Sequence, residues 1–254
     1  MTDTPLILSL ETATLAGSVW VGRGKLQLAT RNGDPQVSQS NSLLSDISAS
    51  LQEARVSLED IDLFACAAGP GSFTGLRIGI ATLKALAATM DQPCLGIPTL
   101  HAVAHSAGAS MATVAVLPAG RGEVFAQLFS VTPVSGELFV KALDTAAHLS
   151  PEKLIDRYGT RATLRWTGNG AHLQRAVIES AGLSRGIVLR DVSAESPPAN
   201  ETQGWALSAN EGILAEHVAA LAQQSYAEGV TQRPDELQAI YVRPSDAELN
   251  MIPA

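Results

Sequence analysis

The sequence has few cysteines, few basic side chains and no long apolar run. Cys66 and Cys94 are its two cysteines, so a disulfide-rich scaffold and a four-thiolate zinc site are excluded. The 17 Lys and Arg side chains stand against 25 Asp and Glu, which gives a formal net charge of −8. Such a chain is a poor stand-alone binder of RNA or DNA, because phosphate binding needs clustered Lys and Arg.

Signals for a membrane or for export are also missing. No stretch of 18 uninterrupted apolar residues occurs, so we expect no membrane span. The N-terminal residues lack a basic stretch followed by a long apolar run, so we expect no signal peptide and a cytoplasmic location. Apolar residues still make up 46% of the 254, which is enough to bury a sizeable core.

Strand-like and helix-like patterns alternate along the chain, without a fixed-period repeat. A meander of three strands at 6–10, 17–21 and 26–30 is followed by a helix, in which Leu43, Leu44, Ile47, Leu51 and Ala54 fall on one face at spacings of three and four. A strand at 61–67, a glycine-rich turn, a long helix and a further strand come next. A second, similar block follows, with a helix at 171–181. This order predicts an α/β fold of two lobes with mixed sheets. We expect a first lobe at residues 1–108, a smaller second lobe at 109–232 and a C-terminal tail at 233–254, with a last short strand at 240–242.

The strongest local feature is the glycine loop, residues 69–75, which reads Gly-Pro-Gly-Ser-Phe-Thr-Gly. A predicted strand enters it and a predicted helix leaves it, so its backbone can approach a ligand closely. Ser72 and Thr74 can either cap the helix or bond a phosphate at the helix N-terminus. The Walker pattern and the Gly-x-Ser-x-Gly elbow are both absent. A tight strand-to-helix turn without a ligand is the alternative interpretation.

Two further groups of residues are candidates for ligand chemistry. Glu11 and Thr12 close the first predicted strand, where a carboxylate can point into a cleft and hold a metal–phosphate group; the alternative is that Glu11 ties down a turn. His101 and His105 lie one helical turn apart, a spacing that suits a metal, but no third ligand is evident and an ordinary helix face is the alternative. No serine has an activating context, so the residues predict no catalytic set.

Several stretches, taken in order, resemble one known family. They are Ser9-Leu-Glu-Thr-Ala-Thr14, Gly69-Pro-Gly-Ser-Phe-Thr-Gly-Leu-Arg-Ile-Gly79, Gly96-Ile-Pro-Thr-Leu100, Gly122-Glu-Val-Phe125 and Tyr241-Val-Arg243. Together they resemble the TsaB family of bacterial tRNA threonylcarbamoyladenosine biosynthesis proteins, also called YeaZ-like or glycoprotease-like. The resemblance covers most of the chain and is strongest over residues 5–130.

The resemblance implies a two-lobed fold of the actin-like ATPase superfamily, which is ribonuclease H-like. It implies a non-catalytic role in making N6-threonylcarbamoyladenosine at position 37 of tRNA, in which the chain docks and activates the transferase TsaD. A small ATPase, TsaE, joins the pair, and homodimers are an alternative assembly. The family further implies that the chain is not an enzyme by itself, that ATP or ADP and Mg²⁺ belong to the partner complex, and that tRNA is contacted only through that complex.

Two sets of residues follow from the resemblance and from the first-lobe patterns. The residues expected near a nucleotide or phosphate are Glu11, Thr12, Gly69, Gly71, Ser72, Thr74 and Gly75. The residues expected on the partner-docking helices are Leu43, Leu44, Ile47, Leu51, Arg77, Gly79 and Lys84. No catalytic residue and no metal ligand is assigned.

Departures from the family pattern concern the nucleotide rather than the scaffold. Glu11 stands where the family often has Asp, and the region Gln39-Ser40-Asn41 lacks a histidine that many members carry. These changes weaken the expectation of an independent nucleotide site. Two other classes stay open: a stand-alone ATPase or phosphotransferase that depends on Glu11, and a peptidase that depends on His101 and His105.

Overall fold

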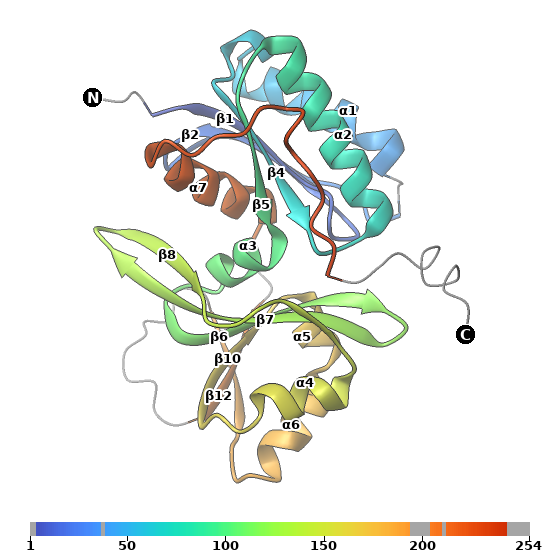
Figure 1. The fold of residues 1–254 in the computed structure, drawn as a ribbon, viewed down its shortest axis with the longest axis vertical. Helices are drawn as coiled ribbons and strands as arrows, with labels where there is room; N and C mark the ends of the chain where they lie inside the picture. The colour runs from blue at the N-terminus through green and yellow to red at the C-terminus, as the bar shows by residue number, and fades with distance from the viewer. Residues whose placement is uncertain (1–3, 37–38, 194–203, 210–211, 243–254) are drawn as a thin grey trace. The chain divides into compact units, whose positions relative to one another are not determined.

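The computed structural model describes residues 4–36, 39–193, 204–209 and 212–242. The chain forms two compact units, each built around its own sheet (Figure 1). Unit 1 comprises Met1–Ala102 and Gly212–Ile240, and unit 2 comprises Val103–Glu211 and Tyr241–Ala254. Both units combine helices with a sheet of parallel and antiparallel strands, which confirms the predicted α/β class with mixed sheets.

Unit 1 carries a five-stranded sheet in the order β3-β2-β1-β4-β5. The antiparallel meander β1–β3 is extended by β4 and β5, which run parallel to β1. Its elements are β1 (Leu6–Glu11), β2 (Ser18–Arg23), β3 (Leu26–Asn32), α1 (Gln39–Ala54), η1 (Leu58–Asp60), β4 (Leu63–Gly69), α2 (Phe73–Met90), β5 (Cys94–Pro98) and α7 (Leu214–Ala227). The division between the units falls within α3 (Thr99–Ser106), after Ala102.

Helices cover both faces of the sheet of unit 1 (Figure 1). Leu8 and Leu10 of β1 pack in one core with apolar side chains of α1 and α2, whereas Ile7 packs in another core with α7. Strand β1 is therefore buried along its whole length, as expected for the central strand of a sheet with helices on both faces.

Helix α7 corrects the expected division of the chain. We expected it in the second lobe, because it follows the second α/β block in the sequence, but it belongs to unit 1. The backbone N–H of Ala215 donates to Ser18 Oγ at 3.1 Å, and Val218 packs with Ile7 in the core under the sheet. The local apolar pattern of α7 shows that it has a buried face and does not show which sheet covers that face.

Residues 231–240, which we call the C-terminal strap, also belong to unit 1. Residues 233–240 were expected in a separate tail and residues 231–232 at the end of the second lobe, but Leu237 lies in the core that contains α1 and α2. Residues 240–242 are not part of a strand, although the N–H of Ile240 donates to the carbonyl of Ala68 at 2.7 Å. Residues 243–254 of the expected tail lie outside the described residues.

Unit 2 carries the second sheet, with the order β11-β12-β10-β6-β7-β8 and β9 paired to β7. Its core is built around Trp166 and Trp205, whose rings are arranged edge to face with their centroids 5.4 Å apart. The elements are β6 (Ser110–Gly120), β7 (Glu123–Val134), β8 (Glu137–Ala142), β9 (Ala147–Leu149), α4 (Pro151–Tyr158), β10 (Thr163–Thr167), α5 (Asn169–Leu173), α6 (Arg175–Leu183), β11 (Leu189–Val192) and β12 (Gly204–Ser208). Within the described ranges, no helix combines the length and apolarity needed to cross a membrane.

Candidate functional site

The candidate site of unit 1 lies where the turn after β1 meets the glycine loop. Glu11 ends β1, and its side chain is only 1% exposed. Its carboxylate accepts hydrogen bonds from the Thr14 N–H at 2.6 Å and from the Thr14 hydroxyl at 2.7 Å. Burial raises the pKa of Glu11, because it disfavours the charged form, while the bonds from Thr14 lower that pKa. Glu11 thus closes its own turn, which is the structural alternative considered from the sequence.

The glycine loop packs directly against the same turn. The Ser72 N–H donates to the Ala13 carbonyl at 2.7 Å. A Cβ atom at Gly71 would lie 2.6 Å from that carbonyl oxygen, so a side chain there would force the two segments apart. Gly71 is therefore needed for contact between two parts of the protein backbone.

The first turn of α2 is capped by the loop itself. Ser72 is the N-cap residue, and its Oγ accepts from the Gly75 N–H at 3.2 Å. The Leu76 N–H donates to the Ser72 carbonyl at 2.8 Å. Thr74 is exposed on the first turn. Of the two roles that the sequence allowed Ser72, the geometry displays the helix cap.

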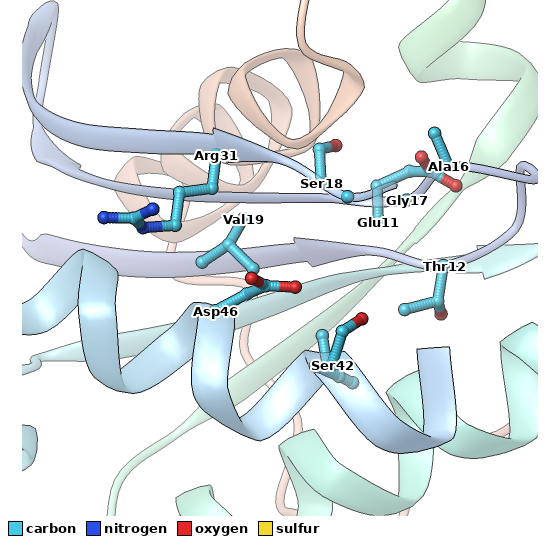
Figure 2. Close-up of a pocket in the computed structure, with 11 residues that line it drawn as sticks. Glu11, Thr12, Ala16, Gly17, Ser18, Val19, Arg31, Ser42 and Asp46 are labelled. Carbon is cyan, nitrogen blue, oxygen red and sulfur yellow. The ribbon is translucent and has the colours of Figure 1, made fainter. Parts of the chain in front are cut away.

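A small polar cavity lies beside Glu11, between the sheet and α1 (Figure 2). Its walls include Arg31 of β3 and both Ser42 and Asp46 of α1, and Figure 2 shows Asp46 directed toward the strands. The cavity has a volume of about 10 Å³. That is room for about one water molecule, and a phosphate group does not fit there without movement of the walls.

Three of the residues expected to dock a partner lie inside unit 1 instead. Leu43, Ile47 and Leu51 are 6%, 3% and 8% exposed and pack against the sheet. The spacing of three and four that singled them out marks the buried face of α1, which is the face turned away from any partner. Leu44, the residue after Leu43, is 66% exposed.

The expected docking residues of α2 also divide into different roles. Gly79 is buried, and a Cβ atom there would collide with Thr12 Oγ1, so Gly79 serves contact between α2 and the end of β1. Arg77 is exposed, with its guanidinium 3.8 Å from the centre of the Phe73 ring. Lys84 reaches the C-terminal strap, and its ammonium donates to the carbonyl of Leu237 at 3.0 Å.

An outward strip of α2 consists of small side chains. The exposed alanines are Ala81, Ala85 and Ala88, which follow Arg77 at helical spacing. The sequence marks Ala81, Ala85 and Ala88 as small residues that let another helix approach closely, at an internal contact or at a subunit interface. The strap was not singled out from the sequence as part of a site.

The histidine pair His101 and His105 lies on α3. Burial lowers the pKa of His105 to about 4 and also lowers that of His101, so both imidazoles are neutral near pH 7. In the described part of the chain, no three His, Cys, Asp or Glu side chains gather as metal ligands would. The structure therefore gives no third ligand to complete the pair.

Comparison with known sequences gives matches along most of the chain. The profile of the family described as TsaD: tRNA N6-adenosine threonylcarbamoyltransferase matches residues 37–236. The tRNA threonylcarbamoyladenosine biosynthesis protein TsaB of Escherichia coli is 29% identical over 93% of this chain and 94% of its own length. A tRNA N6-adenosine threonylcarbamoyltransferase of Chelativorans is 43% identical over 24% of this chain and 16% of its own length.

Comparison with solved structures gives the same fold. YeaZ from Pseudomonas aeruginosa superimposes with a TM-score of 0.69, over 93% of this chain and 99% of that chain, at 23% sequence identity. This chain therefore has the fold of that protein.

Proposed function

We propose, from the premise that this chain belongs to the family described as TsaD: tRNA N6-adenosine threonylcarbamoyltransferase, that it is the non-catalytic partner of a TsaD-like transferase. The chain is a TsaB/YeaZ-like protein with an actin-like ATPase-type fold. In this role it docks and activates the transferase that makes N6-threonylcarbamoyladenosine in tRNA. The observation that carries the proposal is similarity to TsaB along nearly the whole of both chains, whereas the Chelativorans transferase matches about a quarter of this chain.

The geometry at Glu11 favours an accessory, non-catalytic role for this chain over stand-alone phosphoryl transfer. A phosphotransferase keeps amides, cations and carboxylates available for the phosphates and their Mg²⁺. Here the Ser72 and Gly75 amides donate to Ala13 and to Ser72 Oγ, and the Glu11 carboxylate accepts from Thr14. The adjacent cavity of about 10 Å³ is also too small for a phosphate. We place ATP or ADP and Mg²⁺ at the partner complex.

The outward sides of α1 and α2 are the docking face that we propose. Leu44 supplies an exposed apolar side chain on α1, and Arg77 begins the exposed strip of α2. The alanines at 81, 85 and 88 leave room for a partner helix to approach closely. A TsaE-like ATPase and a second copy of this chain are further proposed partners, and tRNA is contacted through the complex.

Mixing this chain with the TsaD-like transferase of the same organism tests the docking face. Size-exclusion chromatography with light scattering, with and without ATP and Mg²⁺, reports the mass of the assembly. We expect a 1:1 complex with the unchanged chain and separate peaks with Leu44→Asp, because an aspartate at the face must be desolvated.

Leu26→Asp is the matched control, since Leu26 is also exposed and lies on β3 of unit 1. We expect it to leave the complex intact. Equal complex formation by both variants contradicts the assignment of Leu44 to the docking face, and separate peaks with the unchanged chain contradict the proposed function.

A further inference from the structure

The C-terminal strap extends the sheet of unit 1 beyond β5. The backbone of Gln232 exchanges two hydrogen bonds of 2.9 Å with Cys94, one in each direction. The Gln232 side chain also accepts from the Gly96 N–H at 3.0 Å. The strap thereby covers the edge of β5, which otherwise presents unpaired backbone groups in these positions.

Lys84 fastens the strap from the side of α2. Its ammonium donates to the Leu237 carbonyl at 3.0 Å and to the Asp235 carbonyl at 3.5 Å. The Leu237 side chain, 2% exposed, enters the core next to Gly96, where a Cβ atom would lie 2.6 Å from Leu237 Cδ1. One charged contact and one buried leucine therefore hold the middle of the strap.

The end of the strap meets the start of the glycine loop. The Ile240 N–H donates to the Ala68 carbonyl at 2.7 Å. The next residue, Gly69, has a φ of +119°, and a Cβ atom there would collide with the Ile240 carbonyl oxygen. The strap thus lies against the backbone at which the loop begins.

Between these anchors the strap is loosely packed. A groove of about 520 Å³ separates residues 231–236 from the C-terminal end of α2. Arg233, Asp235 and Glu236 are exposed and pair with one another within the strap, so these pairs add little to its hold on the sheet. A segment with so few buried apolar contacts opens at a small fraction of the global unfolding free energy.

We propose that the strap is a releasable element latched by Lys84, and that its engagement fixes the start of the glycine loop. Loss of the Lys84 contacts favours the released state, in which the edge of β5 with Cys94 is uncovered and the Ala68 carbonyl loses its donor. The proposal goes beyond the proposed function and stands without it, because every contact that carries it lies inside unit 1.

Cys94 supplies a chemical reporter for strap release. It is fully buried beneath the contact with Gln232, and burial raises the pKa of its thiol to about 11. Cys66, also buried, lies in the same core on β4 and serves as the internal reference. A thiol reagent such as 5,5′-dithiobis(2-nitrobenzoate), applied to the native chain with mass-spectrometric site assignment, measures the two rates separately.

The test compares Lys84→Met with Lys84→Arg, and uses Lys153→Met on the exposed side of α4 as the control. We expect Lys84→Met to raise Cys94 labelling, and amide exchange at Gln232, Gly96 and Ile240, by about tenfold, the factor that corresponds to loss of one charged hydrogen bond. Cys66 stays slow in every variant. Lys84→Arg, which can still donate to the carbonyls, and Lys153→Met remain near the unchanged chain.

Two results overturn the proposal. Unchanged Cys94 labelling in Lys84→Met shows that Lys84 does not latch the strap. An equal rise at Cys66 and Cys94 shows that the substitution loosens unit 1 as a whole. Neither result bears on the proposed function, which is measured by complex formation with the transferase.

Discussion

At the scale of single residues, Glu11 shows how a carboxylate at the end of a strand can serve structure. Its position predicted either a ligand contact or a turn, and the bonds from Thr14 give it the second role in this structure. Burial makes that role costly, because a charged carboxylate leaves water when the protein folds. The raised pKa of Glu11 therefore gives the protein a specific dependence on pH.

We predict that Glu11→Gln removes this dependence. The folded-state pKa lies above the usual value of 4.5, so the folded protein binds more protons than the unfolded chain in the interval above pH 4.5. Stability of the unchanged protein then falls as pH rises through that interval. Urea unfolding of both proteins between pH 4 and pH 7 measures the difference between their free energies of unfolding. We expect Glu11→Gln to become more stable relative to the unchanged protein as the pH rises. A difference that does not change with pH contradicts the prediction.

Gly79 is the second residue whose role the structure changes. It was expected among the residues that dock a partner. Because its position faces Thr12 inside unit 1, we predict that Gly79→Val destabilises the fold by about 1–3 kcal/mol through overpacking. Ala81→Val, at an exposed position of the same helix, should change stability by less than about 0.5 kcal/mol. Thermal unfolding checks both values, and equal stability of the two variants contradicts the assignment.

At the scale of elements, the sequence predicts local structure well where one period dominates. The meander at 6–10, 17–21 and 26–30, the helix ending at Ala54 and the strand before the glycine loop all appear close to their expected positions. The helix expected at 171–181 is divided into α5 and α6 at Gln174, and β12 was not expected at all. Short elements carry too few residues for their period to be distinguished from a loop.

The end of α2 gives a prediction at the same scale. Helix α2 has no basic residue in its last turn and stops at Asp91, which adopts the left-handed conformation at φ 52°. A negative charge at a helix C-terminus and a side chain in the left-handed region both cost stability. We predict that Asp91→Gly stabilises the protein by about 1 kcal/mol, measured by urea unfolding.

Arg55→Gly is the matched control for Asp91→Gly. Arg55 follows α1 in the same left-handed conformation at φ 57°, but its charge suits the helix end. We therefore expect Arg55→Gly to raise the free energy of unfolding by less than Asp91→Gly does. A larger gain at Arg55 contradicts the electrostatic part of the account.

At the scale of the whole molecule, the fold class and family could be read from the sequence, whereas much of the docking face could not. Leu43, Ile47 and Leu51 were selected because they share one face, and the same regularity makes them core residues. Helix α7 and Leu237 return to unit 1 from the far end of the chain. Contacts between residues so far apart in the sequence produce no local hydrophobic periodicity, so only the three-dimensional structure reveals them.

The net charge of −8 also acts at this scale. We predict that the chain alone shows no measurable binding to tRNA at about 0.15 M salt, because it lacks the clustered cations that phosphate binding needs. Filter binding with the chain, the transferase and their mixture checks this. Tight binding by the chain alone contradicts the proposal that tRNA is contacted through the complex.

The central claim is that the chain activates a TsaD-like transferase without supplying the catalytic groups. The most direct test measures N6-threonylcarbamoyladenosine formed in tRNA by a reconstituted system from one organism, using mass spectrometry of the nucleosides. The account predicts product only when this chain is present, a normal yield with Glu11→Gln, and a large loss with Leu44→Asp but not with Leu26→Asp. Equal product formation with and without the chain contradicts it.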